Sequence, residues 1–202
     1  MPINPAILAG LLTQHQKFLA TGQGAPVSFA GMNLDGVNLT GLNLSGANFA
    51  GASLQNASLL GTNLSNCNMA GCNLRGSNLA GAGMSGAKLA GAAMDAAILD
   101  NANMSGADMT SATAQGVSMQ GVQMTSAKLD GADLTGAKLD NANMTGVSLT
   151  SAKLDNASVQ TVNLASAILD GATVNNTNLK GTKVATTSLK NVNTATAVNL
   201  KK

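Results

Sequence analysis

The sequence contains no tryptophan, no tyrosine and only three phenylalanines among its 202 residues. Large aromatic side chains normally supply much of the buried area in a protein core. Their scarcity excludes a core of that kind and requires one built from smaller, more regular side chains. Leucine, methionine, valine and alanine are the apolar residues present in quantity.

An excess of charge of one sign is also missing. All nine acidic residues are aspartate, eleven residues are lysine or arginine, and the formal net charge is +2. A strongly basic surface favours binding to nucleic acid, and a strongly acidic surface is needed to imitate one. This balance favours neither, so we expect no direct nucleic-acid partner.

Long apolar segments are absent as well. No run approaches the ~18 apolar residues of a membrane-spanning helix, and residues 3–12 lack the basic flank and cleavage site of a signal peptide. We therefore expect a cytoplasmic protein with no membrane partner. The two cysteines, Cys67 and Cys72, fit burial or a reducing compartment better than a disulfide framework.

The dominant feature of the sequence is a five-residue repeat, visible in residues 126–145, which read SAKLD GADLT GAKLD NANMT. Every fifth position from Phe29 to Leu189 is apolar, and these 33 positions hold nineteen Leu, eight Met, three Val, two Phe and one Ala. No insertion or deletion breaks the register. A period this strict indicates a repeat architecture, whatever the propensities of the individual residues.

Each five-residue unit predicts a short extended segment followed by a corner. Two places before the large apolar residue, eighteen of the 34 positions hold Ala and seven hold Val. Inward side chains at every second position match the alternation of a strand. Two places after the large residue, Gly or Asn occupies 26 of 33 sites, and both tolerate the positive φ of tight corners. Such a chain buries its leucines only by winding into a coil.

Charged residues indicate how many units form one turn of the coil. Equivalent positions on stacked turns lie about 4.8 Å apart, where like charges repel each other. Between positions i and i+20 every charged pair has opposite signs: Arg75/Asp95, Lys88/Asp108, Asp108/Lys128, Asp133/Lys153 and Asp170/Lys190. The spacings i+10 and i+15 instead bring like charges together, as at Lys128 and Lys138. We therefore predict four units per turn.

Repeat words such as AKLDG at residues 127–131 and ADLTG at residues 132–136 resemble those of the pentapeptide-repeat protein family. The resemblance covers residues 27–192. It implies an all-β solenoid, namely a right-handed four-sided parallel β-helix, here of about eight coils. The family is mostly non-catalytic, and its best-understood members resist topoisomerase poisons by occupying gyrase in place of duplex DNA.

The segment before the repeat predicts a cap. Residues 1–26 contain an expected α-helix that covers the first coil, with Asn4 as N-cap, Pro5 in the first turn and Gly22 at the end. Seven residues form its apolar face: Ile7, Leu8, Leu11, Leu12, His15, Phe18 and Leu19. The segment LLTQHQKFLATGQG resembles a short leader of some bacterial and phage-borne family members.

The segment after the repeat predicts an uncapped end. The register holds through Val192 and then meets Thr194 at a leucine position, so residues 193–202 are expected to form a frayed polar tail. An uncovered coil end presents unpaired strand edges to another chain. In some family members this end is the dimer interface, although the helical extension that they carry is not found in this sequence. A homo-oligomer formed through the C-terminal coil is therefore one expected arrangement.

No residue pattern predicts a catalytic, cofactor or metal site. His15 is the only histidine, and no acidic or cysteine cluster accompanies it, so we expect it at the cap interface. Cys67 and Cys72 hold the small inward position of consecutive units and lack CxxC spacing. The aspartates stand at outward positions, and we interpret them as charge ladders on a solvated face. We expect a protein that is not an enzyme and uses no cofactor or metal.

One outward face carries no charge over six coils. Its first column consists of small hydroxyl residues: Ser45, Ser65, Ser85, Ser105, Thr125 and Thr145. The neighbouring column is mostly amide residues: Asn43, Asn63, Gly83, Asn103, Gln123 and Asn143. We predict that this wall packs against another protein; the alternative is that small polar residues simply suit the exterior of a β-helix.

These features favour a non-catalytic structural or protein-interaction rod that docks partners through its C-terminal end or its Ser/Thr/Asn face. A larger assembly, such as a phage particle, is consistent with the leader resemblance. The alternative is a DNA-mimic modulator of DNA gyrase or topoisomerase, which the near-neutral charge disfavours because mimicry needs a negative surface. Binding of ice or carbohydrate is a third hypothesis, disfavoured by the lack of an aromatic platform.

Overall fold

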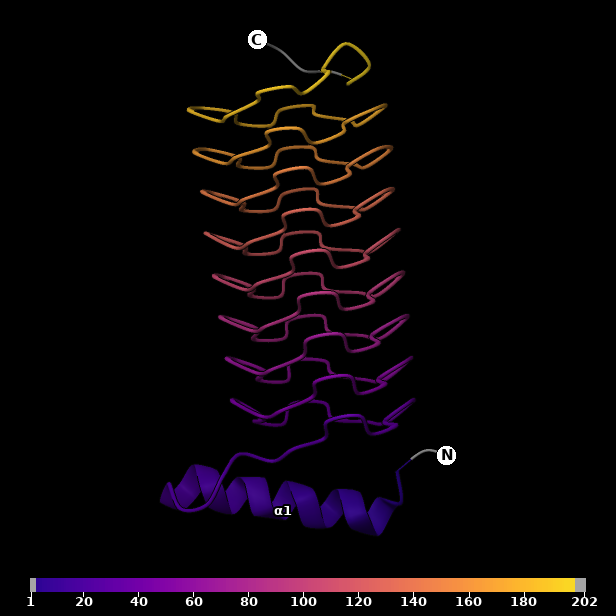
Figure 1. Cartoon of the computed structure of the whole chain (residues 1–202), viewed down its shortest axis with the longest axis vertical. Helices are drawn as coiled ribbons and strands as arrows, with labels where there is room; N and C mark the ends of the chain where they lie inside the picture. Colours follow the sequence, from indigo (N-terminus) through magenta and orange to yellow (C-terminus); the bar gives the residue numbers. More distant parts are fainter. Residues whose placement is uncertain (1–2, 199–202) are drawn as a thin grey trace.

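The computed structural model describes residues 3–198. One helix, α1 (Pro5–Thr21), lies across the N-terminal end of a straight stack of coils (Figure 1). No helix among the described residues is long and apolar enough to cross a bilayer. The helix and the first coil therefore form one end of a rod, and the last coil forms the other.

The coils pair with one another through single-residue parallel bridges. Every bridge joins positions i and i+20, and the first turn shows four of them: Ser28 with Asn48, Asn33 with Ser53, Asn38 with Ser58 and Asn43 with Asn63. This confirms the predicted four units per turn and gives each turn four paired sides. Within residues 3–198 each side is too short to form an extended strand. The right-handed sense of the coil stays a prediction.

Backbone hydrogen bonds repeat identically from turn to turn. The N–H of Leu34 donates to the carbonyl of Ser53 at 2.7 Å, and the N–H of Ser53 donates back to Met32 at 2.9 Å. The N–H of the next outward residue takes no part in this ladder, and asparagine supplies its acceptor: Asn33 Oδ1 accepts from the N–H of Asp35 at 3.0 Å. The asparagine that often precedes the leucine position thus accepts a hydrogen bond from a backbone N–H that has no partner in the ladder between turns.

The corners have positive φ wherever the sequence predicts them. Gly36 has φ +67° and Asn56 has φ +55°, in the left-handed region that both residues tolerate. Where the repeat departs from Gly or Asn the geometry stays the same, since Ala96 has φ +56° and Thr161 has φ +55°. The coil therefore imposes this conformation on residues that disfavour it.

The core is a column of side chains along the axis of the rod. The leucine or methionine and the small residue of each unit are buried from Val27 to Val174, with few gaps. Phe29 and Phe49 stack within the column with ring centroids 4.9 Å apart. Because every unit repeats the same inward pair, this core reaches close packing without tryptophan or tyrosine.

Helix α1 begins and ends at the predicted residues. The side chain of Asn4 accepts from the N–H of Ala6 at 2.8 Å, and Gly22, at φ +67°, donates its N–H to Phe18 at 2.8 Å. Leu8, Leu11 and Leu12 pack against the core. These contacts cover the first coil with the apolar face of the helix.

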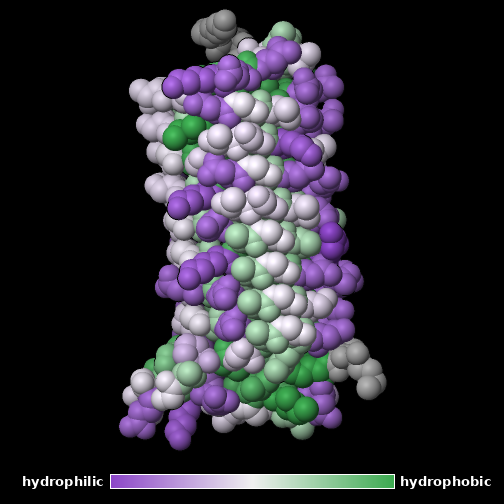
Figure 2. All heavy atoms as spheres, in the orientation of Figure 1, coloured by the Kyte–Doolittle hydropathy of each residue, from purple (hydrophilic) through white to green (hydrophobic). Residues whose placement is uncertain are grey.

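Two residues of the predicted apolar face do not share in this contact. Ile7 is 57% exposed and Leu19 is 37% exposed. Ile7 lies at the edge of the apolar stripe, and Leu19 borders a hollow of about 90 Å³ beside Leu42 and Leu44. Ile7 belongs to the first turn of α1 and Leu19 to its last, so the exposed residues lie at the two ends of the helix. On the face drawn in Figure 2, hydrophobic side chains gather at the end that carries α1.

Candidate docking surfaces

The predicted Ser/Thr column is continuous in the structure. The neighbouring Asn column forms an unbroken ladder of bridges from Asn43 to Asn163, which places the six hydroxyl residues directly above one another. All six are partly buried. Ser105 Oγ donates to Asn103 Oδ1 at 2.8 Å, and Thr145 Oγ1 donates to Asn143 Oδ1 at 2.7 Å. Several hydroxyl donors are thus used within the wall, and its binding role stays a prediction.

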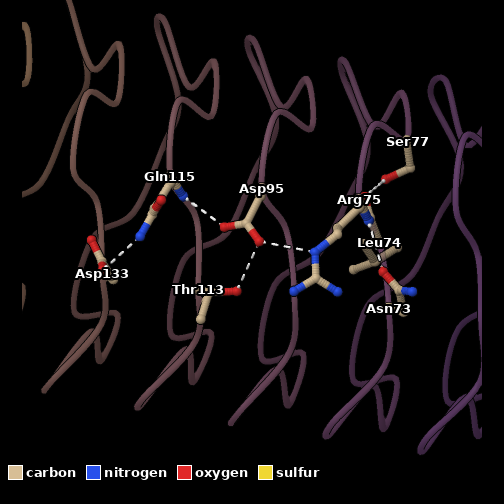
Figure 3. Close-up of polar contacts among 8 residues, drawn as sticks. All are labelled: Asn73, Leu74, Arg75, Ser77, Asp95, Thr113, Gln115 and Asp133. Atoms are coloured by element: carbon tan, nitrogen blue, oxygen red, sulfur yellow. Dashed lines mark hydrogen bonds and ion pairs between the residues drawn. The ribbon is translucent and has the colours of Figure 1, made fainter.

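The aspartates are more than solvated charges, as Asp95 shows (Figure 3). Asp95 Oδ1 accepts from the backbone N–H of Gln115 at 3.0 Å, and Oδ2 accepts from Thr113 Oγ1 at 3.2 Å, both on the next turn. On the preceding side Oδ2 also meets Arg75 Nε at 3.0 Å. One carboxylate therefore clamps consecutive turns together.

The same clamp recurs wherever an aspartate follows the leucine position. In each case the carboxylate at position i accepts from the N–H at i+20 and from a Ser or Thr hydroxyl at i+18: Asp35, Asp95, Asp100, Asp130, Asp140, Asp155 and Asp170. The sequence holds the signal, because each of these aspartates has Ser or Thr at that spacing. The interpretation as charge ladders alone missed it.

The other two aspartates precede the leucine position, and each accepts from a threonine within its own turn. Asp108 Oδ1 accepts from the N–H and the hydroxyl of Thr110 at 3.0 and 2.6 Å. These bonds, the hydroxyl first, lower the pKa of Asp108 below its ordinary value. Asp133 bonds Thr135 in the same way and pairs with Lys153 at 3.6 Å. All nine carboxylates therefore stabilise the coil.

The two cysteines are buried free thiols, as the small inward position predicts. Cys67 Sγ donates to the carbonyl of Leu44 at 3.0 Å. Burial raises the pKa of each thiol to about 12. Residues 3–198 contain no group of three or more His, Cys, Asp or Glu arranged to hold a metal ion. The thiols therefore serve as small core residues.

His15 lies where α1 meets the first coil and is fully buried. Its Nδ1 accepts from the N–H of Val27 at 3.2 Å, and its ring stacks on Phe18 with centroids 5.9 Å apart. An accepting Nδ1 places the proton of the neutral ring on Nε2, and Nε2 is buried without a partner among residues 3–198. Burial lowers the pKa of His15. Neutral His15 therefore links α1 to Val27, where the coil begins.

The last turn is open at the C-terminal end. Leu189 is 37% exposed, and Val184 and Val192 are only partly buried, although all three point into the core. Beneath them an apolar cavity of about 20 Å³ extends toward Leu169 and Val174. The interior of the rod therefore reaches the surface at this end.

Backbone edges are open there too. One turn earlier, Leu164 and Leu169 donate their N–H groups to Lys183 and Ser188 at 2.8 and 2.9 Å. The equivalent N–H groups of Val184 and Leu189 find no backbone acceptor within residues 3–198. The ladder does continue beyond the predicted start of the tail at residue 193, since Asn178 bridges Val198. The remaining residues of that tail, 199–202, lie outside the described part.

A four-sided coil with a five-residue repeat, a helix over one end and an open core at the other defines a β-helical repeat protein. The model of the family called Pentapeptide repeats matches residues 33–69, 57–95, 87–125, 127–164 and 142–181. The chain belongs to this family, as the repeat words indicate.

Solved structures resemble the chain along most of its length. HetL from the cyanobacterium Nostoc sp. strain PCC 7120, a pentapeptide repeat protein involved in regulating heterocyst differentiation, is 25% identical. The match has a TM-score of 0.54 and covers 90% of this chain and 94% of HetL. A trypsin-treated form of QnrB1, a plasmid-mediated fluoroquinolone resistance protein, is 20% identical with a TM-score of 0.58, covering 82% and 76% of the two chains. Curated protein sequences gave no match.

Proposed function

We propose that this chain is a non-catalytic rod that binds a protein partner end-on at its C-terminal turn. The observation that carries the proposal is the exposed interior of that turn, where Val184, Leu189 and Val192 face solvent in part. Capping an apolar cross-section stabilises a solenoid, and here α1 covers the first coil alone. A partner at the other end would bury apolar area and accept the edge N–H groups.

The Ser/Thr column from Ser45 to Thr145 is a second candidate surface, retained because it is uncharged and continuous. Interfaces of this kind are polar and are held by hydrogen bonds and bridging water. Rods that dock at an end and along a side act as spacers, and a phage particle or a similar assembly is one setting for them. The open end remains the stronger candidate because Leu189, a core position, is exposed there and no described helix covers it.

The hypothesis of a DNA mimic at gyrase receives no support from the charges. A mimic must present negative charge along the whole rod, yet between Asp35 and Lys88 the chain carries only Arg75. The likeness to QnrB1 is a likeness of fold. Inhibition of gyrase supercoiling by the purified chain would revive this hypothesis.

The test is capture of a partner by three forms of the protein. The intact chain, Val184→Asp/Leu189→Asp and Ser85→Arg are immobilised, and proteins bound from the source lysate are identified and then purified for direct binding. We expect a partner that the end variant loses and the Ser85 variant keeps. If only Ser85→Arg loses the partner, the binding site lies on the Ser/Thr column. If both variants keep the partner, neither proposed surface is the binding site. Circular dichroism establishes that each variant is folded.

A further inference from the structure

We propose that the partner of the open end carries acidic residues around an apolar centre and is not a second copy of this chain. The proposal rests on the proposed function and adds the chemistry of the partner. Its starting point is the uneven distribution of charge along the rod. All nine aspartates lie between residues 35 and 170, and no acidic residue follows Asp170.

Lysine is the only charged residue type after Asp170, and Asp170 itself lies one turn beneath Lys190. Lys180, Lys183 and Lys190 are exposed. They stand on three different sides: Lys183 bridges Asn163, Lys190 follows Ser188 and Leu189, and Lys180 follows Asn178 and Leu179. The three ammonium groups therefore stand on several sides of the exposed core, and two of them, Lys180 and Lys183, have no carboxylate one turn beneath them.

The apolar residues at the centre of this end favour the same kind of partner. Val184 and Leu189 present apolar side chains, and their N–H groups are without a backbone acceptor in the described chain. An N–H donor is satisfied by a carbonyl or carboxylate oxygen. Apolar side chains in the middle and acceptor or anionic oxygens at the margin thus complement both features of the end.

A second copy of the chain supplies the apolar side chains but no anionic oxygens at the margin. Two open ends facing each other bring together lysines from both copies, and the one nearby carboxylate of each copy, Asp170, already accepts from Ser188 and from the N–H of Lys190. The N-terminal end presents α1, whose sequence PAILAGLLTQHQKFLAT has no acidic residue and includes Lys17. The carboxylates of the middle of the rod are engaged in the clamps described above, and the exposed isoleucines near them, Ile98 and Ile168, each stand between polar residues of the neighbouring turns. Charge complementarity therefore selects a different protein.

The first experiment asks whether the intact chain self-associates through this end. Sedimentation velocity is measured at about 50 mM and about 500 mM NaCl, a range over which surface charge interactions become screened. We expect a monomer in both. A dimer that strengthens with salt and is lost in Val184→Asp/Leu189→Asp would overturn the proposal in favour of a second copy.

The second experiment determines the chemistry of the ligand with a random peptide library displayed on phage. The intact chain selects peptides, and the enriched peptides are synthesised and titrated. We expect them to combine Asp or Glu with large apolar residues. Affinity should fall about tenfold in Lys180→Asp/Lys183→Asp, and also when salt is raised to about 500 mM. These two lysines have Gln160 and Asn163 beneath them, so the reversal breaks no ion pair.

A matched control carries the same change of net charge elsewhere. Lys17→Asp/Lys138→Asp alters α1 and a wall where Lys138 lies between Ser118 and Ser158. This variant should bind the peptides as the intact chain does. Equal loss in both variants, or selected peptides without acidic residues, would overturn the acidic-partner proposal. If Val184→Asp/Leu189→Asp still abolishes binding in that case, the proposed function survives; if it does not, the proposed function fails as well.

Discussion

At the N-terminal end of the rod, the inward positions that elsewhere hold alanine carry larger apolar residues: Val27, Met32, Val37 and Leu42. At the C-terminal end the same positions carry threonine: Thr177, Thr182 and Thr187. The larger residues lie at the end of the rod that α1 covers, where Met32, Val37 and Leu42 pack at the margin of the core. The threonines bond backward instead, as Thr187 Oγ1 does to the carbonyl of Leu164 at 2.6 Å. The same repeat thus builds one end that α1 covers and one end that stays open.

The leucine positions also hold larger side chains at the N-terminal end than at the C-terminal end. The first turns hold Phe29 and Phe49, whereas the three valines of this column all fall in the last turns: Val159, Val174 and Val184. Smaller side chains at a constant turn size leave space, and the apolar cavity lies there. The comparison teaches that substitutions within the repeat, without any change of register, decide which end closes and which end stays available.

The largest difference is expected from one substitution made in two places of the same column. Leu89 is fully buried and Leu189 is 37% exposed. Leu89→Ala removes a packed side chain and should lower the free energy of unfolding by about 2–5 kcal/mol. Leu189→Ala should cost less than about 1 kcal/mol, because solvent already reaches the site. Urea unfolding measures both, and equal losses would mean that the last turn is sealed.

A smaller difference is expected from the carboxylate clamps. Asp140 Oδ1 accepts from Ser158 Oγ at 2.7 Å and from the N–H of Gln160 at 2.8 Å in the middle of the rod. Asp140→Ala removes both bonds and should cost about 1–3 kcal/mol. Asp170→Ala removes the equivalent bonds to Ser188 and Lys190 at the open end and should cost less. Thermal melts in parallel test this, with Asp140→Asn as the variant that keeps one acceptor.

Acidification should loosen the two ends in different pH ranges. Burial lowers the pKa of His15, so the unfolded chain takes up its proton first and stability falls as the pH drops below about 6.5. Protonation would also turn Nδ1 from an acceptor into a donor facing the N–H of Val27. Hydrogen bonds from Ser188, then from the N–H of Lys190, lower the pKa of Asp170, so the clamp stability at the open end is present above about pH 4 and is lost below it.

Hydrogen exchange of α1 and of the last turn distinguishes the two ranges when it is followed from about pH 7.5 to about pH 3, which brackets the ordinary pKa values of histidine and aspartate. His15→Gln should remove the upper transition and leave the lower one. A single transition shared by both ends would contradict the assignment of the upper range to the cap.

The smallest difference concerns two threonines in the same inward role. Thr62 is fully buried and donates Oγ1 to the carbonyl of Leu39 at 2.8 Å, whereas Thr187 is only partly buried. Thr62→Val deletes a buried hydrogen bond and should cost about 1 kcal/mol. Thr187→Val should be close to neutral, since water replaces the lost bond. Equal losses in the free energy of unfolding, measured in urea, would mean that Thr187 is as well shielded from water as Thr62.

The architecture could be predicted from the sequence because its determinants are periodic. One register of 33 apolar positions, together with charge pairs at i and i+20, specified the turn, and the caps of α1 are local signals at Asn4 and Gly22. The aspartate clamps were missed because a hydroxyl at i+18 has meaning only after the turn length is known. The exposure of Ile7 and Leu19 depends on how α1 docks on the first coil, which no local pattern records.

The state of individual groups could not be predicted for a different reason. Whether Nε2 of His15 finds a partner depends on the docking angle of α1, and whether Leu189 is covered depends on the groups that lie beyond it in space. Both are tertiary properties of the ends, where the repeat no longer supplies a neighbour on each side. The walls of the rod were therefore more predictable than its ends.

The most direct test of this account is native-state hydrogen exchange of the free chain, comparing bonded amides at the two ends. Leu34 and Leu39 donate to Ser53 and Ser58 under the cap, whereas Ser188 donates to Ala167 in the last turn at a similar distance of 2.9 Å. We predict that residues 179–198 exchange at least about tenfold faster than residues 29–53, because the open turn unfolds locally. Equal protection at the two ends would contradict the account, since it would show the C-terminal turn to be closed.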